Sequence, residues 1–268
     1  MPDWIAFSVD LEPNKDDSLD GVAGAMDWFD QVIPRGNVYA THRIATELPG
    51  VINALAADHE IGVHVHPREF GHEHDQLAEL DKDRQRELIT ETRIALARAA
   101  KISEHEITAF RAGRHSANKA TFSVLADLGF EMDSSINVRY TDYLPDSLTS
   151  RRDPFILESG LFELPTTYGR PPLLSLTGLR LFPDRNLTAT ANNLRTDRRG
   201  CSGLHALSWL RDTVSGLSMY MHPYDATVYH EELSNSGAVF RKRAERLLNP
   251  IESSAFVSAS DLYDSHGK

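Results

Sequence analysis

Two carboxylates and two histidines occur in pairs, each pair with one residue between its members. The acidic pair is Asp10 and Glu12, in SVDLEP, and the histidine pair is His64 and His66, in HEIGVHVHP. Alternate residues of a β-strand point to the same side, and each pair ends a short apolar run and precedes a proline. Each pair can therefore face one site, and two imidazoles with a carboxylate are a common ligand set for an open zinc site.

Other interpretations of these residues stay open at this point. Taken alone, Glu12 fits a solvated loop residue and Asp10 fits a turn cap. A second histidine pair with the same spacing, His72 and His74, follows in PREFGHEHDQ. It lies beyond the apolar run and among polar residues, which favours a solvated loop, so we expect neither of these two histidines at the site.

The composition predicts a single soluble domain. At 268 residues with 41% hydrophobic residues, the chain can bury a sizeable core, and α/β barrels often run to about 250 residues as one domain. No segment approaches the roughly 20 consecutive apolar residues of a membrane span, so we expect no transmembrane segment. A single cysteine, Cys201, excludes an internal disulfide and a cysteine-based zinc site. A metal would therefore need histidine and carboxylate ligands.

The charge of the chain excludes one class of partner. The 39 acidic and 28 basic residues give a net charge of −11, which repels a phosphate backbone, so we expect no binding to nucleic acid. Acidity of this size fits a high-salt cytoplasm and an ordinary acidic enzyme equally. The beginning, MPDWIAFSVD, has no basic segment followed by an apolar run, and it therefore predicts the first strand of a cytoplasmic protein.

Short apolar runs alternate with helical patterns along the chain. Seven runs predict strands: Ile5–Val9, Val38–Thr41, Ile61–Val65, Ile107–Phe110, Phe162–Leu164, Leu217–Met221 and Phe256–Ser258. The clearest helical pattern runs from about Gln76 to Ala100, and another starts near Asn118. This alternation predicts an α/β protein with a parallel sheet, open or closed into a barrel. Residues 169 to 203 are rich in Pro, Gly, Asn and Arg, which predicts an irregular insertion near the mouth of the fold.

Five segments occur in the order of the motifs that they resemble in the polysaccharide deacetylase family, the NodB-homology domain of carbohydrate esterase family 4, and a sixth resembles the family's closing elements. HEIGVHVHP is similar to the family's HEIGNHTxxHP, and SVDLEP stands where the family has TFDDGP. AFRAGRHSANKATFSVLADLGFEMDSSI resembles the third motif, in which a strand bearing an arginine leads to a helix and a further strand. FELPTT is similar to a later strand, and LSMYMHPYD to the last motif with its histidine. AFVSASDLY resembles the closing strand and helix, so the resemblance covers nearly the whole chain.

The resemblance implies a distorted (β/α) barrel of the NodB-homology type, commonly with seven parallel strands, in one catalytic domain over residues 1–268. It implies metal-dependent hydrolysis of the amide of an N-acetylated sugar. Asp10 then matches the catalytic base, Arg111 the arginine that holds the base, His222 the general acid and His64 the first metal histidine. The metal would be a divalent ion, with zinc the first choice.

Two metal ligands depart from the family pattern. Leu11 replaces the second Asp of TFDD, so the carboxylate ligand must be Glu12, and the second histidine must be His66, two residues after His64 instead of four. Both departures suit a regular strand, because Leu11 points away from the side that Asp10 faces. The chain can therefore assemble the same kind of ligand set, which we expect to be Glu12, His64 and His66.

Two other functions remain open from the sequence. One is an amidohydrolase of the same superfamily that acts on a cyclic amide or imide without metal, and the other is a glycan-binding relative without turnover. Arg114 and Tyr224 lie near the motifs and are candidates for contact with the substrate. The expected partner is an N-acetylated carbohydrate, such as a free, lipid-linked or nucleotide-linked precursor. Nothing in the sequence requires an oligomer.

Overall fold

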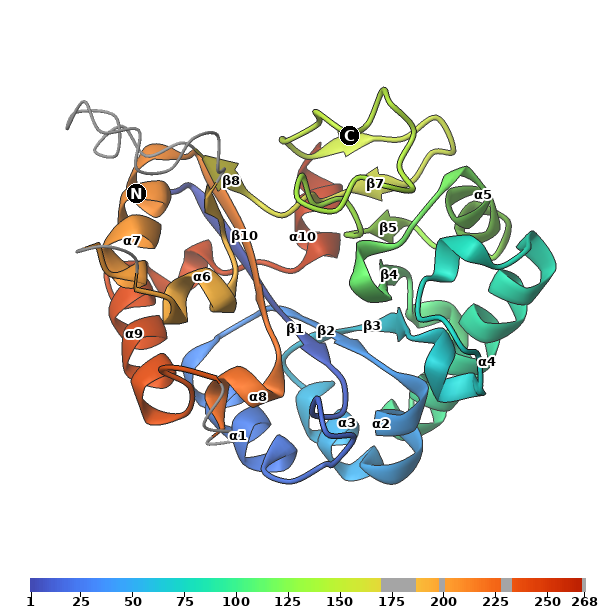
Figure 1. The fold of residues 1–268 in the computed structure, drawn as a ribbon, viewed down its shortest axis with the longest axis horizontal. Coiled ribbons are helices and arrows are strands. Elements are labelled where there is room, and N and C mark those ends of the chain that lie inside the picture. Colours follow the sequence, from blue (N-terminus) through green and yellow to red (C-terminus); the bar gives the residue numbers. More distant parts are fainter. Residues whose placement is uncertain (170–186, 198–200, 228–232, 267–268) are drawn as a thin grey trace.

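The centre of the structure is one curved, mainly parallel β-sheet (Figure 1). The computed structural model describes residues 1–169, 187–197, 201–227 and 233–266. The sheet consists of β1 (Trp4–Leu11), β2 (Asn37–Ala40), β3 (Glu60–Val65), β4 (Ala109–Ala112), β5 (Met132–Asp133), β6 (Phe155–Ile156), β7 (Phe162–Glu163) and β10 (Gly216–Met221). Its order is β10-β1-β2-β3-β4-β5-β7-β6, in which seven strands run parallel and β6 pairs antiparallel with β7. The predicted distorted barrel is confirmed, with one antiparallel strand more than expected.

Helices cover the outer face of this sheet. They are α1 (Val22–Val32), α2 (His42–Glu47), α3 (Pro49–Leu55), α4 (Lys82–Ala100), α5 (Lys119–Asp127), α6 (Ala191–Arg195), α7 (Gly203–Thr213), α8 (Pro223–Ala226), α9 (Ala238–Leu248) and α10 (Ala259–His266). In Figure 1, α1 to α3 lie below the sheet, α4 and α5 to its right, and α7 and α9 to its left. None of the described helices is both long and apolar enough to cross a membrane.

Strand alternation separates an outer core from the interior of the half-barrel. Along β1, Phe7 and Val9 belong to the large core cluster beneath the helices, whereas Ala6 belongs to a smaller cluster. Tyr39 of β2 and Ala109 of β4 join this smaller cluster, and Leu262 of α10 packs against them. α10 therefore closes the amino-terminal end of the strands. The next inward positions along the strands carry polar side chains.

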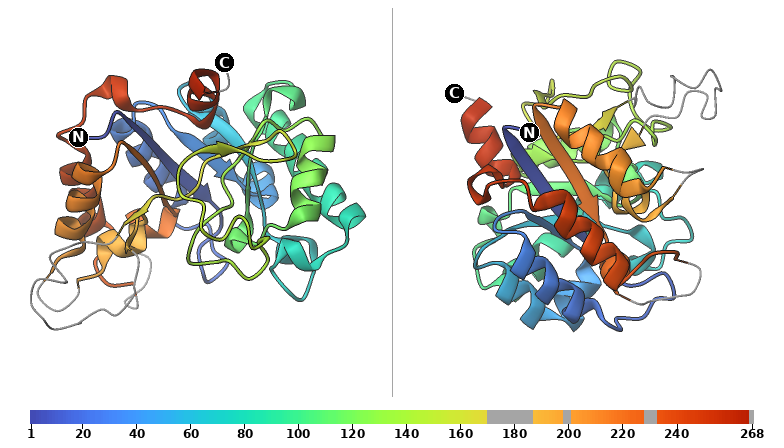
Figure 2. Two further views of the ribbon diagram at one scale, coloured as in Figure 1. Left: turned by 90° about the horizontal axis from the view of Figure 1, so that it is seen from above. Right: turned by 90° about the vertical axis from the view of Figure 1, so that its left-hand side faces the viewer.

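The half-barrel stays open between its edge strands β6 and β10, and the segment after β7 reaches across to β10. The Thr167 N–H donates to the Ser218 carbonyl at 3.0 Å, and the Ser218 N–H donates to Thr167 Oγ1 at 2.8 Å. Because Ser218 lies in β10, these two bonds tie the edges together without a full strand. The right-hand view of Figure 2 shows β10 alongside β1, the strand with which it pairs.

Capping residues decide where two predicted helices begin. The pattern from Gln76 predicts one helix, but residues 77–79 form a separate 3₁₀ turn. α4 begins after Asp81, whose carboxylate accepts the Arg84 N–H at 2.8 Å, as an N-cap should. Asn118 caps α5 in the same way through the Thr121 N–H at 3.0 Å, so the predicted start near Asn118 is confirmed.

Two segments differ from the sequence-based expectation. The predicted strand Phe256–Ser258 forms only a single bridge to Ile5, because Ser258 already bonds to Asp261 of α10 and the chain turns into the helix. Within 169–203, the described part contains β8 (Tyr168–Gly169) paired with β9 (Leu187–Thr188), followed by α6. Residues 170–186 and 198–200 of the expected irregular insertion lie outside the described residues.

A buried pair of carboxyl groups lies inside the sheet, where Asp133 of β5 stands opposite Glu163 of β7. Asp133 is 1% exposed and Glu163 is fully buried. Ser135 donates to one oxygen of Asp133 at 2.6 Å, and the Ile136 N–H donates to one oxygen of Glu163 at 2.9 Å. The second oxygen of each group has no other donor. Burial and the neighbouring carboxyl raise the pKa of Glu163 well above its usual range, so one shared proton completes the bonding.

This pair predicts a pH dependence of stability. A carboxyl whose pKa is raised in the folded state holds its proton after the unfolded chain has lost it, so the free energy of unfolding should fall as pH rises above the usual pKa of 4.5. The contribution is at most about 1.4 kcal/mol per pH unit for one proton. Glu163→Gln can donate a hydrogen bond to Asp133 but does not titrate. The free energy of unfolding of this variant, measured by urea denaturation between pH 5 and 9, should therefore not show this fall. Parallel profiles of wild type and variant would contradict the shared proton. Exposed Glu158→Gln serves as the control.

Candidate metal and catalytic site

Three potential metal ligands converge at the carboxyl ends of β1 and β3. Glu12 follows β1, His64 lies in β3 and His66 follows that strand. Their ligand atoms all lie within 4.8 Å of one another. The two histidine Nε2 atoms are 3.1 Å apart, and Glu12 Oε2 lies 2.7 Å from His66 Nε2 and 3.6 Å from His64 Nε2. Tetrahedral zinc with bonds near 2.1 Å separates its ligand atoms by about 3.4 Å, so these three donors fit a divalent cation.

The other ring nitrogen of each histidine is held by an acceptor. His64 Nδ1 lies 2.8 Å from the Arg111 carbonyl oxygen, and His66 Nδ1 lies 2.8 Å from Asp75 Oδ2. Both acceptors lack a proton to give, so each Nδ1 must carry the hydrogen. Each Nε2 then faces the ligand cluster, where it can present its lone pair when the ring is neutral, which is the arrangement that metal-binding histidines need.

The carboxylates around His66 govern its protonation. Burial alone would lower the pKa of His66, but Glu12 and Asp75 on either side raise it to about 10. In turn His66 and His64 hold the pKa of Glu12 well below its usual range, against the effect of burial. Without a cation, the positive charge of the cluster therefore resides on His66, and a metal must displace that proton.

Asp75 is a site residue that sequence reasoning missed. It lies in PREFGHEHDQ, which we interpreted as a solvated loop, yet it is only 7% exposed and also accepts from Arg114 Nε at 3.0 Å. An acidic residue nine positions after a histidine carries no recognisable pattern. The two histidines of this segment lie away from the ligand cluster, as predicted. His72 accepts a hydrogen bond from Arg84 Nε at 3.0 Å, and His74 is exposed.

Arg111 holds Asp10 in the interior of the half-barrel. Arg111 Nη1 donates to Asp10 Oδ1 at 2.5 Å and to Ser8 Oγ at 2.9 Å. Its other nitrogens donate to the carbonyl oxygen and the Oγ of Ser134 at 3.0 and 2.8 Å, and its guanidinium lies 4.2 Å from the centre of the Tyr39 ring. Burial would raise the pKa of Asp10, but Arg111 and nearby histidines lower it overall. Asp10 is therefore ionised and fixed in orientation.

His222 approaches the same point from β10. Its Nε2 lies 3.9 Å from Asp10 Oδ2 and 3.8 Å from Glu12 Oε1, while its Nδ1 lies 3.4 Å from Asp225 Oδ2. Asp225 was also missed by sequence reasoning, and Arg195 Nε donates to it at 2.6 Å. Burial would lower the pKa of His222, but hydrogen bonding to Asp225 and the nearby carboxylates raise it. His222 is thus poised to donate a proton.

A cavity of about 280 Å³ adjoins His222. Tyr224 lines it and stacks on His222, with ring centres 4.6 Å apart and planes at 11°. Tyr140 also lines it, is 49% exposed and lies flat on His115 at 5.3 Å. Its volume lies just below the roughly 300 Å³ at which pockets for small molecules begin, and its lining is mainly polar, so the cavity has room for a small polar ligand. Of the two residues expected near the substrate, Tyr224 lies here, while Arg114 instead holds Asp75.

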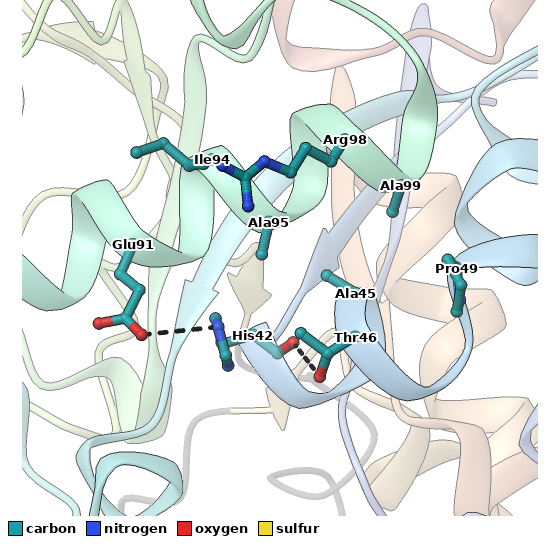
Figure 3. A pocket seen from close by; sticks show the side chains of 9 residues that line it. All are labelled: His42, Ala45, Thr46, Pro49, Glu91, Ile94, Ala95, Arg98 and Ala99. Carbon is teal, nitrogen blue, oxygen red and sulfur yellow. Dashed lines mark hydrogen bonds and ion pairs between the residues drawn. The ribbon is translucent and has the colours of Figure 1, made fainter.

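A second cavity, of about 340 Å³, lies between α2, α3 and α4 (Figure 3). Its one ion pair joins His42 Nε2 to Glu91 at 3.7 Å, and the rest of its lining is mostly small or apolar. None of the six predicted site residues lines this cavity. The chemistry of the described residues therefore gathers at the carboxyl ends of the strands.

Comparison with known proteins finds similarity in structure only. No protein-family model matches the sequence, and no curated protein matches it. Among solved structures, a protein from Mycobacterium smegmatis assigned as a polysaccharide deacetylase is 17% identical, with a TM-score of 0.59 over 99% of this chain and 91% of that one. The peptidoglycan deacetylase PdaC from Bacillus subtilis is 11% identical, with a TM-score of 0.53 over 97% of this chain and 90% of that one.

The same fold also occurs without activity. A family 4 carbohydrate esterase pseudoenzyme from Bacillus anthracis is 9% identical, with a TM-score of 0.53 over 97% of this chain and 65% of that one. Identities this low are evidence for the fold and not for a shared activity. At that level the resemblance drawn from the sequence motifs is confirmed, and the chain has the fold of solved polysaccharide deacetylases.

Proposed function

We propose that this protein is a metal-dependent hydrolase that removes the N-acetyl group from an amino sugar or glycan precursor. The observation that carries the proposal is the arrangement of Asp10, paired with Arg111, and His222 beside the Glu12, His64 and His66 cluster. The chain shares its fold with solved deacetylases, but the proposal rests on these side chains and not on the fold.

The proposed cofactor is a divalent cation, with zinc the first choice. Two imidazoles and one carboxylate leave a fourth position open, which is the usual composition of a catalytic zinc site. When bound, such an ion polarises a carbonyl and makes water a stronger acid. A metal-free amidohydrolase would need no ligand cluster of this kind, so the cluster favours the deacetylase over the cyclic-amide alternative.

The side chains supply the proton transfers of amide hydrolysis. Asp10, held ionised by Arg111, accepts the proton of the water that attacks the acetyl carbonyl. His222 donates a proton to the amine nitrogen as its bond to the acetyl carbon breaks, and Asp225 supports the positive charge that His222 carries beforehand. General acid and base groups placed in this way each contribute about 100-fold or more to a rate.

Metal binding tests the ligand cluster directly. Chelator-treated protein should take up one equivalent of zinc, measured by calorimetry, and His66→Ala should lose this binding. Asp75→Asn should weaken the affinity by about 10- to 100-fold, because it removes the acceptor that orients His66. His66 must lose a proton whose pKa is about 10, so the affinity should rise with pH below that value, by about tenfold per pH unit for one proton.

His72→Ala is the matched control, since His72 has the same spacing from its neighbour but bonds to Arg84 away from the cluster. It should bind zinc like the wild type. Equal zinc affinity in His66→Ala and His72→Ala would remove His66 from the ligand set.

Release of acetate tests the reaction itself. With zinc supplied, the protein should deacetylate an N-acetylhexosamine substrate, and His222→Gln should lower kcat by about 100-fold or more while zinc affinity is kept. Asp10→Asn should lower kcat similarly, but it also leaves the buried Arg111 charge unpaired, so its melting temperature must be measured alongside. Absence of acetate from all N-acetylhexosamine substrates tried, with zinc bound, would indicate a glycan-binding protein without turnover.

A further inference from the structure

Two cationic side chains line the cavity beside His222. Lys15 lies in the loop after β1 and Arg139 in the segment after β5. In the sheet these strands are separated by β2, β3 and β4, so the curvature of the half-barrel brings the two loops to one cavity. Both side chains are exposed. The cavity therefore carries two positive charges from distant parts of the chain.

Neither cation is neutralised within the described part of the chain. No carboxylate there pairs with Lys15 or Arg139, whereas two other charged groups of the lining, Arg195 and Asp225, bond to each other at 2.6 Å. The protein as a whole carries a net charge of −11, so unpaired positive charge in a cavity runs against the general trend of its surface. A local excess of one sign in a cleft attracts ligands of the opposite sign.

The position of Lys15 relates this charge to the proposed reaction. Its ammonium nitrogen lies 5.2 Å from the centre of the Tyr224 ring, and the same ring stacks on His222 at 4.6 Å. A negative group bound by Lys15 would therefore lie about one aromatic ring away from the proposed acid. This separation suits a charged substituent on the same small molecule as the acetamido group.

Building on the proposed function, we propose that the substrate is an N-acetylated amino sugar with an anionic substituent, a phosphate or a carboxylate, which Lys15 and Arg139 bind. Tyr140, which is 49% exposed, offers an aromatic face to the sugar ring, and the two cations select the substituted sugar over the neutral one. Lys15 and Arg139 are thus specificity-determining residues of the cavity.

Binding measured without turnover tests this inference separately from the deacetylase reaction. Chelator-treated protein at low salt is titrated with N-acetylglucosamine, its 6-phosphate, its 1-phosphate and N-acetylmuramic acid. At least one anionic sugar should bind about tenfold or more tightly than the neutral sugar, which is the effect of one charge-assisted hydrogen bond. The preference should shrink in 0.5 M salt, because exposed charges are then screened within about 4 Å. The phosphate and carboxylate sugars together distinguish the two kinds of substituent.

Matched charge variants locate the effect. Lys15→Gln/Arg139→Gln should lower the ratio of anionic to neutral affinity by about tenfold or more, and Arg139→Lys, which keeps the charge, should retain most of it. Lys119→Gln/Arg98→Gln removes the same charge from exposed positions outside this cavity and should leave the ratio unchanged.

The outcomes separate the two proposals. Equal affinity for neutral and anionic sugars, or an equal loss in both double variants, would overturn the anionic selectivity even if acetate release is observed. Selective binding of an anionic sugar that is never deacetylated with zinc supplied would instead overturn the proposed reaction and leave the binding inference standing.

Discussion

The buried ion pair of Arg111 and Asp10 is the contact on which the candidate site depends. Arg111 is 2% exposed, and its side chain joins β4 to Asp10 and Ser8 of β1 and to Ser134 after β5. Its carbonyl oxygen also orients His64, so one residue positions both the proposed base and a metal ligand. Breaking such a pair leaves a buried charge unpaired, at a cost of about 3–5 kcal/mol. A change that breaks this ion pair would therefore both disturb the site and destabilise the interior of the barrel.

Strand alternation explains why the unusual motif spacings still assemble a site. Leu11 and Val65 are fully buried in the outer core, so the residues on either side of each point into the half-barrel. A carboxylate at position 11, where the resembled family has one, would have to leave that core or bend the strand. With Glu12 and His66 instead, both strands keep their regular course and the ligand atoms still converge.

The sequence predicted what depends on periodicity and strand ends, but our interpretation missed two capping carboxylates and one contact across a loop. The paired motifs were found because alternation makes their side chains converge. Asp75 was missed because its burial arises from a loop that folds back over His66, and Asp225 because its role follows from α8 turning back beneath His222. The segment 256–258 has the composition of a strand, but capping of α10 ends its pairing after one bridge. Asp225 and Asp261 each lie three residues after the backbone N–H that they accept, a local capping pattern that the sequence contains. Only the contact of Asp75 with His66 crosses a loop that no local pattern encodes.

The environments of Asp10 and His222 push their pKa values in opposite directions. Arg111 lowers the pKa of Asp10, and Asp225 raises that of His222, although the two groups lie only 3.9 Å apart. These opposite shifts favour Asp10 as the group that accepts a proton and His222 as the group that donates one, which is the division of roles that acid–base catalysis requires. Asp10 has a buried counter-charge in Arg111, and His222 has one in Asp225. Neither group therefore depends on the other to keep its protonation state. A water or amide between them could therefore exchange protons with both without first breaking a direct bond between acid and base.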